Sequence, residues 1–581
     1  MASILLTVGA LAAGLLLIPE LFGDFIAYQI GLYLIYGIAA QGIGLVWGKA
    51  GVLPLGQALF FGIGAYVAAA ALRSGLSLPV QSLVAVVVIA VLSLAAYALA
   101  SLVFRGRSES GPYFSLMTLA LVLIAEQLAS TATAITGGFN GLSGFSAIGG
   151  LDAYSELYYL IVAVTVAVAA GLLWLNTRPL SVLMRAVSAN EPRVQILGCA
   201  SHRVKGLVFA LSAGLAVVAG GLFASHQGIV TPTASGFALS AELVIFAAIG
   251  GRFHVLGPLI GAVVVGWVSA ELRDRFAAME MAMALAFIVV VMRAPGGLAE
   301  LVATPVARWL PARRTRGVGR ATAPPVRHAT HPRGLEFASV QVESGVVRIL
   351  NGTQFSTPDS GVVCVIGPNG AGKTSVLNAI TGHLPLTSGA IRLGGERIDG
   401  EPPYRALRQG VGRKLQVPSV FTELSVQENV MLGAMAGRAR WRDWFATAPF
   451  GWSSPALRAV LDHPDVPLIG AWSQPAGTLP QGHRQYLELA MTLAAEPGVL
   501  LLDEPCAGLS PAETALMSEL IRHYQRQSGA LVIVIEHDMS LVESISDRVV
   551  VLHQGETLAE GDYATVRQQP AVQAVYAGAT K

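Results

Sequence analysis

Long apolar runs separated by short polar stretches fill the first half of the chain. From Met1 to about Arg293 charged residues are sparse, and the runs approach the roughly 20 residues that cross a bilayer as a helix. The segment 237–250 is short, and 52–72 contains Pro54 and several glycines, which is compatible with a broken or re-entrant helix. We expect an all-α polytopic membrane domain of about ten spans, at residues 2–22, 27–47, 52–72, 79–104, 113–136, 157–175, 206–226, 237–250, 254–271 and 277–293.

After Arg333 the composition becomes that of an ordinary α/β protein. With 581 residues, 53% hydrophobic and 13% charged, the chain is too long for one domain and too apolar to be wholly soluble. The stretch PARRTRGVGRATAPPVRHATHPRG between the halves has no apolar period and predicts a flexible basic tether. We predict a membrane domain over 1–299, a Pro/Arg-rich linker over 300–333 and an α/β domain over 334–581.

Charge adds little. The net charge is +2, and the basic residues lie mainly in loops beside membrane segments and in the linker, so we expect membrane lipid around the chain and no nucleic acid. The three cysteines lack metal spacing and imply no disulfide framework.

The sequence GPNGAGKT, residues 367–374, predicts a phosphate-binding loop between a strand and a helix. Glycines let backbone N–H groups approach phosphates, Lys373 reaches the β and γ oxygens, and Thr374 supplies a hydroxyl to Mg²⁺. The match to the full loop pattern predicts ATP and Mg²⁺ as cofactors. The residues assigned to nucleotide binding here are Gly367, Asn369, Gly370, Gly372, Lys373, Thr374 and Ser375.

A second buried strand, VLLLDEP, ends in two adjacent acids. Asp503 is placed to hold the magnesium, and Glu504 can polarise the attacking water for in-line displacement. The strand in LVIVIEHD then delivers His537, whose imidazole could contact the γ-phosphate, although a lone histidine there is more often structural.

Together these motifs resemble the ATP-binding cassette family, whose order they follow over about 240 residues. The resemblance implies that Gln416, in GRKLQVPSV, senses the γ-phosphate, belongs to the magnesium site with Thr374 and Asp503, and links the nucleotide to the membrane partner. It also implies that Leu479, Gly482 and His483 of LPQGH form the signature that closes over ATP held by a second cassette.

Two departures from the family pattern stand out. The usual signature LSGGQ is LPQGH here, without its serine and final glutamine, and no aromatic for adenine stacking occurs in VQVESGVV. Neither change touches Lys373, Asp503, Glu504 or His537, so we expect an ATP-hydrolysing translocase.

The first half resembles the permeases of branched-chain amino acid importers and the closely similar urea and short-amide importers. The resemblance rests on GVLPLGQALFFGIGAYVAA, GPYFSLMTLALVL, TGGFNGLSG, ANEPRVQILGCASHRVKGLVFALSAGLAVVAGGLF and ELVIFAAIGGRFHVLGPLIGA. It implies a fused permease and ATPase that requires a second permease, a second cassette and an extracytoplasmic substrate-binding protein. LPQGHRQYLEL and ANEPR lean toward the urea and amide branch.

The polar loop 176–205 carries a helical pattern around Val182, Ala186, Val194 and Leu197. Its charge alone is equally compatible with contact to anionic headgroups, but the resemblance implies that it docks into the cassette. Because the cassette must meet cytosolic ATP and basic loop residues such as Lys49, Arg185 and Arg203 would then lie inside, we expect a multi-pass inner-membrane protein with a cytoplasmic cassette.

Polar residues inside the spans are candidates for lining a path or for pairing between helices, namely Gln57, Glu126, Gln127, His226 and Glu242. Gly62, Gly64, Gly220 and Gly221 are expected to allow close helix packing.

Three other functions stay open at this point. An exporter half fused to a cassette would explain the domain order, although such halves usually have six long spans with extended cytoplasmic helices. An ATP-regulated membrane protein without transport fits the atypical signature. A cassette that binds ATP without hydrolysing it, leaving turnover to a partner site, is the third. No residue set separates branched-chain amino acids from urea as substrate.

Overall fold

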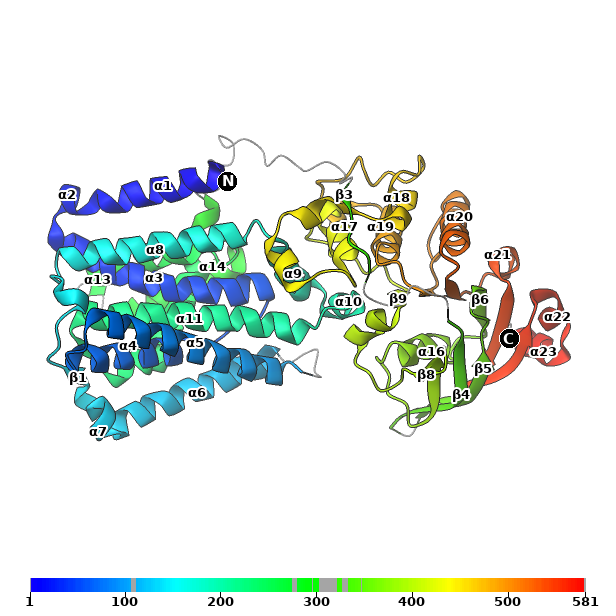
Figure 1. Cartoon of the computed structure of the whole chain (residues 1–581), viewed down its shortest axis with the longest axis horizontal. Helices are drawn as coiled ribbons and strands as arrows, with labels where there is room; N and C mark the ends of the chain where they lie inside the picture. The colour runs from blue at the N-terminus through cyan, green and yellow to red at the C-terminus, as the bar shows by residue number, and fades with distance from the viewer. Residues whose placement is uncertain are drawn as a thin grey trace. The chain divides into compact units, whose positions relative to one another are not determined.

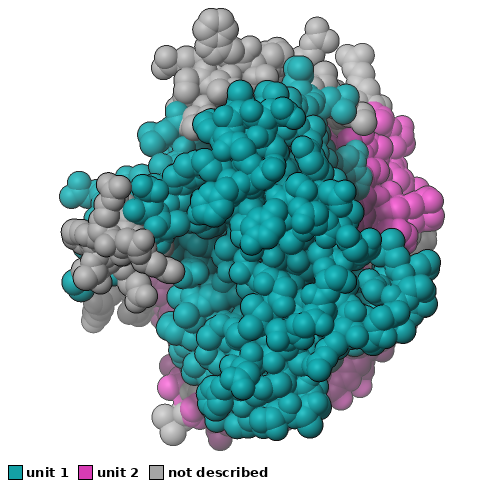
Figure 2. Space-filling model, turned by 90° about the vertical axis from the view of Figure 1, so that its left-hand side faces the viewer, with its two compact units in different colours: residues 1–188, 201–314 teal, residues 189–200, 315–581 magenta. Residues whose placement is uncertain are grey.

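The computed structural model describes residues 2–105, 111–273, 279–294, 296–301, 321–326, 333–345 and 347–578. They form two compact units, shown in different colours in Figure 2. We call residues 1–188 and 201–314 the helical unit, and residues 189–200 and 315–581 the sheet unit. Each unit is described by itself below.

The apolar runs of the helical unit form helices (Figure 1). Their bounds are α1 Ala2–Leu16, α2 Ile18–Phe22, α3 Asp24–Ala50, α4 Gln57–Arg73, α5 Leu78–Val103, α6 Gly111–Thr131, α7 Thr133–Thr136, α8 Glu156–Leu175, α9 Pro179–Ala189, α11 Ser201–Gln227, α12 Phe237–Gly250, α13 Gly257–Arg273 and α14 Met279–Arg293. A short antiparallel pair, β1 Leu142–Ser143 and β2 Ile229–Val230, joins two of the loops.

Every predicted span overlaps a helix, but the helices differ in length. Six described stretches are long and apolar enough to cross a membrane: Ile4–Phe22, Asp24–Ala50, Leu78–Val103, Gly111–Thr131, Glu156–Leu175 and Ser201–Gln227. The predicted spans 52–72, 237–250, 254–271 and 277–293 correspond to the shorter α4, α12, α13 and α14, of 17, 14, 17 and 15 residues, and residues 277–278 lie outside the described residues. At 1.5 Å per residue these helices reach about 21 to 26 Å, less than the roughly 30 Å hydrocarbon core.

Helix α11 lies at the centre of the helical unit, packed against α3, α4 and α5. Close approach to α4 requires Gly220, because a Cβ there would overlap the backbone oxygen of Phe61. Gly62 and Gly64 are equally tight against Ser235 and Val217, as predicted. Gly221 is not, since its added Cβ would lie 3.9 Å from Ala68 Cβ, an ordinary van der Waals distance.

The polar residues of the spans are mostly engaged within the bundle. Gln57 is fully buried and donates from Nε2 to Ser212 O at 2.8 Å, which ties α4 to α11. His226 Nε2 lies 3.0 Å from Tyr28 O. Glu126 accepts from the backbone N–H of Phe237 at 3.3 Å, at the start of α12. Gln57, His226 and Glu126 therefore hold helices together, which is the packing alternative left open by the sequence.

The described residues of the sheet unit form two larger sheets, the two-stranded pair β3 and β10, and their covering helices (Figure 1). The strands are β3 Ala321–Thr322, β4 Leu335–Ser344, β5 Val347–Ser356, β6 Gly361–Ile366, β7 Ser388–Leu393, β8 Glu396–Arg397, β9 Val411–Lys414, β10 Trp452–Ser453, β11 Val499–Asp503, β12 Leu531–Ile535, β13 Arg548–His553 and β14 Glu556–Gly561. The helices are α10 Glu191–Ile196, α16 Lys373–Ile380, α17 Val426–Met435, α18 Pro455–Leu461, α19 Gln481–Leu493, α20 Pro511–Ser528, α21 Met539–Ile545, α22 Tyr563–Gln568 and α23 Pro570–Gly578.

The larger sheet has the order β14-β13-β6-β12-β11-β9 and is parallel except for β14. Every residue of β6, β11 and β12 is buried, which explains their continuous apolar sequences. A four-stranded antiparallel sheet, β5-β4-β7-β8, packs its apolar residues into the same core. Because β6, β11 and β12 are parallel neighbours, the residues that follow them meet at one sheet edge.

Part of the predicted tether has regular structure. Most of residues 300–333 lies outside the described residues, but Ala321 and Thr322 form β3, which pairs in parallel with β10. The backbone N–H of Ala323 donates to Ser453 O at 2.8 Å, and Arg438 Nε donates to Pro324 O at 2.8 Å. Residues 321–324 of the linker are therefore bound within the sheet unit, a contact that the Pro- and Arg-rich composition did not predict.

Replacing Gly220 should disrupt the helical unit. The Cβ of Gly220→Ala has no room beside Phe61 O, so α4 and α11 must separate, at a cost on the order of 1–3 kcal/mol for an overpacked site. Thermal unfolding of the purified chain in detergent measures this. Gly221→Ala, in the same helix turn with open space, is the matched control, and equal melting temperatures for the two variants would contradict the packing.

Candidate functional site

The phosphate loop lies between β6 and α16, as predicted. Gly367 has φ 152° and no space for a side chain, because a Cβ would overlap Leu552 O, and Gly372 caps α16 with φ 95°. Asn369 and Gly370 are exposed, and Ser375 is half-buried in the first helical turn. The loop thus presents backbone N–H groups at a helix N-terminus, the arrangement that binds phosphate.

Lys373 folds back over the loop. Its ammonium donates to Gly367 O at 2.8 Å and to Pro368 O at 3.0 Å. Burial lowers the pKa of Lys373, and the nearby carboxylates of Glu504 and Asp503 counter that shift. The lysine is therefore held at the loop by carbonyl groups that a phosphate can replace.

The residues predicted to act in hydrolysis converge on Glu504. Gln416 donates from Nε2 to Glu504 Oε2 at 2.9 Å, and His537 Nδ1 lies 3.8 Å from Glu504 Oε1. Glu504 itself has φ 44°, a left-handed conformation that is strained for a non-glycine residue. The backbone N–H of Glu504 donates to Ile535 O at 3.0 Å, which holds the strained turn against β12.

Two oxygen groups beside the loop fit a magnesium ion. Thr374 Oγ1 and Asp503 Oδ1 lie 3.5 Å apart, and hard oxygen ligands of this type, completed by phosphate oxygens and water, are what Mg²⁺ prefers. Burial raises the pKa of Asp503, and the guanidinium of Arg413 counters this. Gln416, the third predicted ligand, donates from its amide nitrogen to Glu504, and its role as a magnesium ligand stays a prediction.

The signature residues lie elsewhere in the sheet unit, at the start of α19. Leu479 is buried just before the helix, and Gly482 and His483 are in its first turn. A Cβ at Gly482 would overlap the carboxylate of Glu513, the residue that caps α20 through Ser510. The structure therefore groups the signature with α20.

The sequence reasoning missed Arg413, which positions Asp503. Its Nη2 lies 3.7 Å from Asp503 Oδ2, and Nη1 donates to Asn378 Oδ1 at 2.8 Å and Thr381 Oγ1 at 2.9 Å. Burial lowers the pKa of Arg413 to about 10, with Asp503 and then Glu488 opposing the shift. Two adjacent basic residues, Arg413 and Lys414, inside the buried strand β9 were the signal that could have found it.

The loop predicted to dock into the cassette does so. Residues 189–200 belong to the sheet unit, where Asn190 accepts from the backbone N–H of Arg193 at 3.0 Å and donates to Ser419 Oγ at 2.9 Å. The helical pattern of the 176–205 loop forms two short helices, α9 and α10, separated at Asn190, and α11 begins at Ser201.

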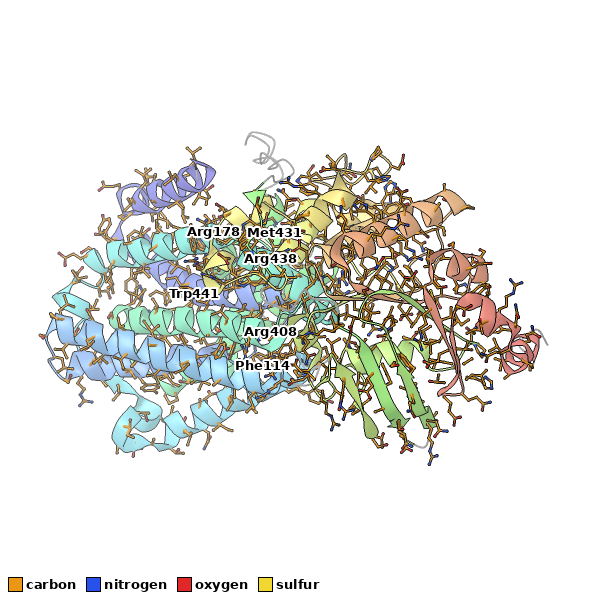
Figure 3. All side chains as sticks on the ribbon, turned by 45° about the vertical axis from the view of Figure 1, so that its right-hand side comes forward. Phe114, Arg178, Arg408, Met431, Arg438 and Trp441 are labelled. Carbon is orange, nitrogen blue, oxygen red and sulfur yellow. The ribbon has the colours of Figure 1, made fainter. Side chains whose placement is uncertain are left out.

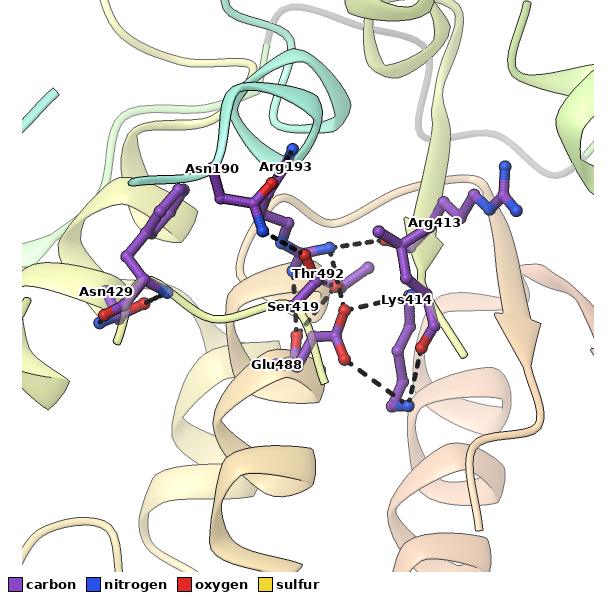
Figure 4. A network of polar contacts seen from close by, with 10 residues as sticks. Asn190, Arg193, Arg413, Lys414, Ser419, Asn429, Glu488 and Thr492 are labelled. Carbon is purple, nitrogen blue, oxygen red and sulfur yellow. Dashed lines mark hydrogen bonds and ion pairs between the residues drawn. The ribbon is translucent and has the colours of Figure 1, made fainter. Parts of the chain in front are cut away.

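Arg193 is the centre of this docking and is fully buried (Figure 4). It donates from Nη1 to Arg413 O at 2.9 Å and from Nη2 to Thr492 Oγ1 at 3.1 Å, and Nη1 lies 3.4 Å from Glu488 Oε1. Burial lowers the pKa of Arg193, and Glu488 opposes that shift. A guanidinium keeps its charge in proteins. The docked helix therefore holds a permanent positive charge beside the carboxylate of Glu488.

Glu488 connects the docked helix with residues that were predicted to act in hydrolysis. Its Oε2 lies 3.6 Å from Lys414 Nζ, and its Oε1 accepts from the backbone N–H of Leu415 at 3.1 Å, directly before Gln416. The side chains of Arg193, Glu488 and Lys414 are all fully buried. Buried contacts thus run from α10 through β9 to Asp503, and a half-buried contact at Leu415 leads to the exposed Gln416.

Comparison with known proteins agrees with both halves. Residues 25–293 match the family described as "Branched-chain amino acid transport system / permease component", and residues 350–507 match the family described as "ABC transporter". The high-affinity branched-chain amino acid transport ATP-binding protein BraF of Pseudomonas aeruginosa is 37% identical over 254 residues, which cover 42% of this chain and 97% of BraF.

Further similar proteins are of the same kind. The high-affinity branched-chain amino acid transport ATP-binding protein LivG of Escherichia coli K12 is 34% identical over 253 residues, covering 42% of this chain and 97% of LivG. A crystal structure of a nucleotide-free ATP-binding cassette from an ABC transporter is similar with 24% identity and a TM-score of 0.36, covering 42% of this chain and 98% of that one.

The cassette relatives are matched over nearly their full length, and the membrane helices precede the cassette in the same polypeptide. The chain therefore belongs to the ABC transporter family, as a membrane protein that joins a permease domain of the branched-chain amino acid transport type to an ATP-hydrolysing cassette.

Proposed function

We propose that this chain is the fused permease and ATPase subunit of an importer that takes up branched-chain amino acids or related small amides such as urea. The observation that carries the proposal is the docked helix α10, whose Arg193 is buried on Glu488 within the cassette. A permease loop held in this way can transmit movement of the cassette to the membrane helices.

In the proposed reaction each catalytic group has one task. Lys373 and the loop N–H groups hold the phosphates, Thr374 and Asp503 hold Mg²⁺, and Glu504 orients and polarises the attacking water. Gln416 and His537 both contact Glu504, so a change in either moves the group beside the γ-phosphate. Leu479, Gly482 and His483 close over the ATP of a second cassette, since no single chain supplies both faces.

Coupling follows from the position of Glu488. Closure of two cassettes over ATP moves Gln416, and Gln416 is one residue from Leu415, whose N–H is bonded to Glu488. The same carboxylate is paired with Arg193 of α10. Displacement of the strand end therefore pulls on α10 and, through the chain, on α9 and α11.

The complete transporter would contain a second permease, a second cassette and an extracytoplasmic substrate-binding protein that sets most of the specificity. We place the permease over 1–299 in the inner membrane, the linker over 300–333, and the cassette over 334–581 in the cytoplasm. The longest described helices, α3 and α11, have 27 residues each, without the long cytoplasmic extensions of exporter halves.

Uptake measurements test the function directly. Cells that express this chain with its neighbouring binding protein and permease receive labelled leucine or, separately, labelled urea. Uptake of one of the two would identify the substrate branch. Uptake of neither, with ATP hydrolysis intact, would argue for another small amide or for export.

Replacing Glu504 should stop the cycle after ATP binding. We expect Glu504→Gln to retain ATP and to lose hydrolysis and uptake, because an amide cannot accept a proton from the attacking water. Lys373→Ala should lose ATP binding itself. Nucleotide retention and phosphate release on the purified chain distinguish the two, and unimpaired hydrolysis in Glu504→Gln would refute its assigned role.

Replacing Arg193 should separate hydrolysis from uptake. Breaking one partner of a buried ion pair costs about 3–5 kcal/mol, which should undock α10, while Lys414 remains to neutralise Glu488. We expect Arg193→Met to lose at least about tenfold in uptake, the change that roughly 1.4 kcal/mol produces, and to keep ATPase activity. Arg203→Met, an exposed basic residue of the same loop, is the control. Parallel losses of both activities in Arg193→Met would contradict the coupling role.

A further inference from the structure

The sheet unit carries an exposed aromatic and basic segment, RARWRDWF at residues 438–445, between α17 and β10. Trp441 is 79% exposed, more than any other large apolar side chain described in this unit, and it is flanked by the exposed Arg440 and Arg442. Its ring meets Phe445 edge-on at 6.3 Å. The cassette roles assigned above do not use this segment.

The base of the segment lies beside the docked helix. Arg438 is buried, donates to Ala494 O and pairs with Glu496 at 2.7 Å (Figure 3 labels Arg438 and Trp441). Two residues earlier, Thr492 accepts from Arg193 of α10. The same end of α19 is therefore held by an arginine of the permease loop and by the arginine that anchors the segment.

The docked helix α10 is close in the chain to a membrane helix. Only the four residues 197–200 separate α10 from α11, which is long and apolar enough to cross a membrane, and the five Cα–Cα steps from Ile196 to Ser201 reach at most about 18 Å. The linker arrives at the same place, since Arg438 also binds Pro324 O and β3 pairs with β10. Within the sheet unit, residues 321–324 of the linker therefore bind residues 438–453, and the end of α19 that Arg438 contacts also binds α10.

The chemistry of the segment fits the polar surface of a bilayer. An indole ring is favoured at the headgroup level, and arginine is attracted to the anionic lipids of the cytoplasmic leaflet. The carboxylate of Asp443 accepts from the backbone N–H of Arg440 at 2.7 Å, so it is turned toward the chain. Two exposed cations and one exposed aromatic therefore form the outer surface of the segment.

We propose that residues 440–445 contact the cytoplasmic leaflet, with the Trp441 ring in the headgroup layer and Arg440 and Arg442 on the phosphates of anionic lipids. The contact is a third attachment of the cassette, beside the docked helix and the linker. It limits the directions in which the cassette can tilt during closure. It does not depend on which substrate is carried.

Fluorescence of Trp441 in lipid nanodiscs tests the contact. The full chain, purified with the subunits that accompany it, is placed in phosphatidylcholine discs with or without phosphatidylglycerol. The emission lost in Trp441→Phe gives the Trp441 signal, which is then quenched by lipids brominated near the headgroup or by aqueous acrylamide. Trp472→Phe, a buried cassette tryptophan, is the control.

The expected result is loss of most Trp441 emission to brominated lipid, with stronger quenching when phosphatidylglycerol is present. Arg440→Gln with Arg442→Gln should remove that lipid dependence, whereas Arg526→Gln, an exposed arginine of α20, should not. Quenching by acrylamide alone would place Trp441 in water and overturn the proposal. Protection from both quenchers would mean that a protein surface covers Trp441, and would overturn it too.

Discussion

The buried pair between Arg193 and Glu488 is the interaction on which the proposed coupling of permease and cassette depends. Removing two charges from water costs several kcal/mol each, and the cost is recovered only when geometry and additional hydrogen bonds are good. Here Arg193 also has carbonyl and hydroxyl acceptors on Arg413 and Thr492, and Glu488 has Lys414 and the N–H of Leu415. The pair is therefore specific for one position of α10, since a shifted helix would leave a buried charge without partners.

The same contacts explain why β9 carries charges inside a sheet. Arg413 and Lys414 are buried on a strand next to β11, where an apolar pair would pack more simply. Their charges form two different ion pairs: Arg413 pairs with Asp503, and Lys414 pairs with Glu488. One short strand thus links the acid that is proposed to hold magnesium with the acid that holds the docked helix. Exchange of Arg413 for an apolar residue would remove the cation beside the buried Asp503, whereas Glu488 would keep Arg193 if Lys414 were exchanged.

The local chemistry of the nucleotide site could be predicted from sequence because it depends on contiguous motifs. GPNGAGKT needs only its own strand and helix, and Asp503 and Glu504 need only the strand before them. Parallel order of β6, β11 and β12 then brings these residues to one edge. The helix positions were predictable for a similar reason, because a helix that crosses lipid needs a long apolar run. The lengths of α4, α12 and α13 were harder to predict, since buried glycines and prolines end helices locally.

Contacts between distant segments could not be predicted. Arg193 and Glu488 are 295 residues apart, and nothing in ANEPR or in LPQGHRQYLELA states that these charges meet. The bound end of the linker is a similar case, because β3 is only two residues long and its partner β10 is equally short. Both depend on a surface assembled from several elements around α19. That surface also binds Arg438. The permease loop and the aromatic segment 438–445 therefore both contact the end of α19, and the linker binds Arg438. A movement of α19 would displace the contacts of all three, so in the proposed coupling this helix is the element that carries ATP-driven rearrangement of the cassette toward the membrane domain.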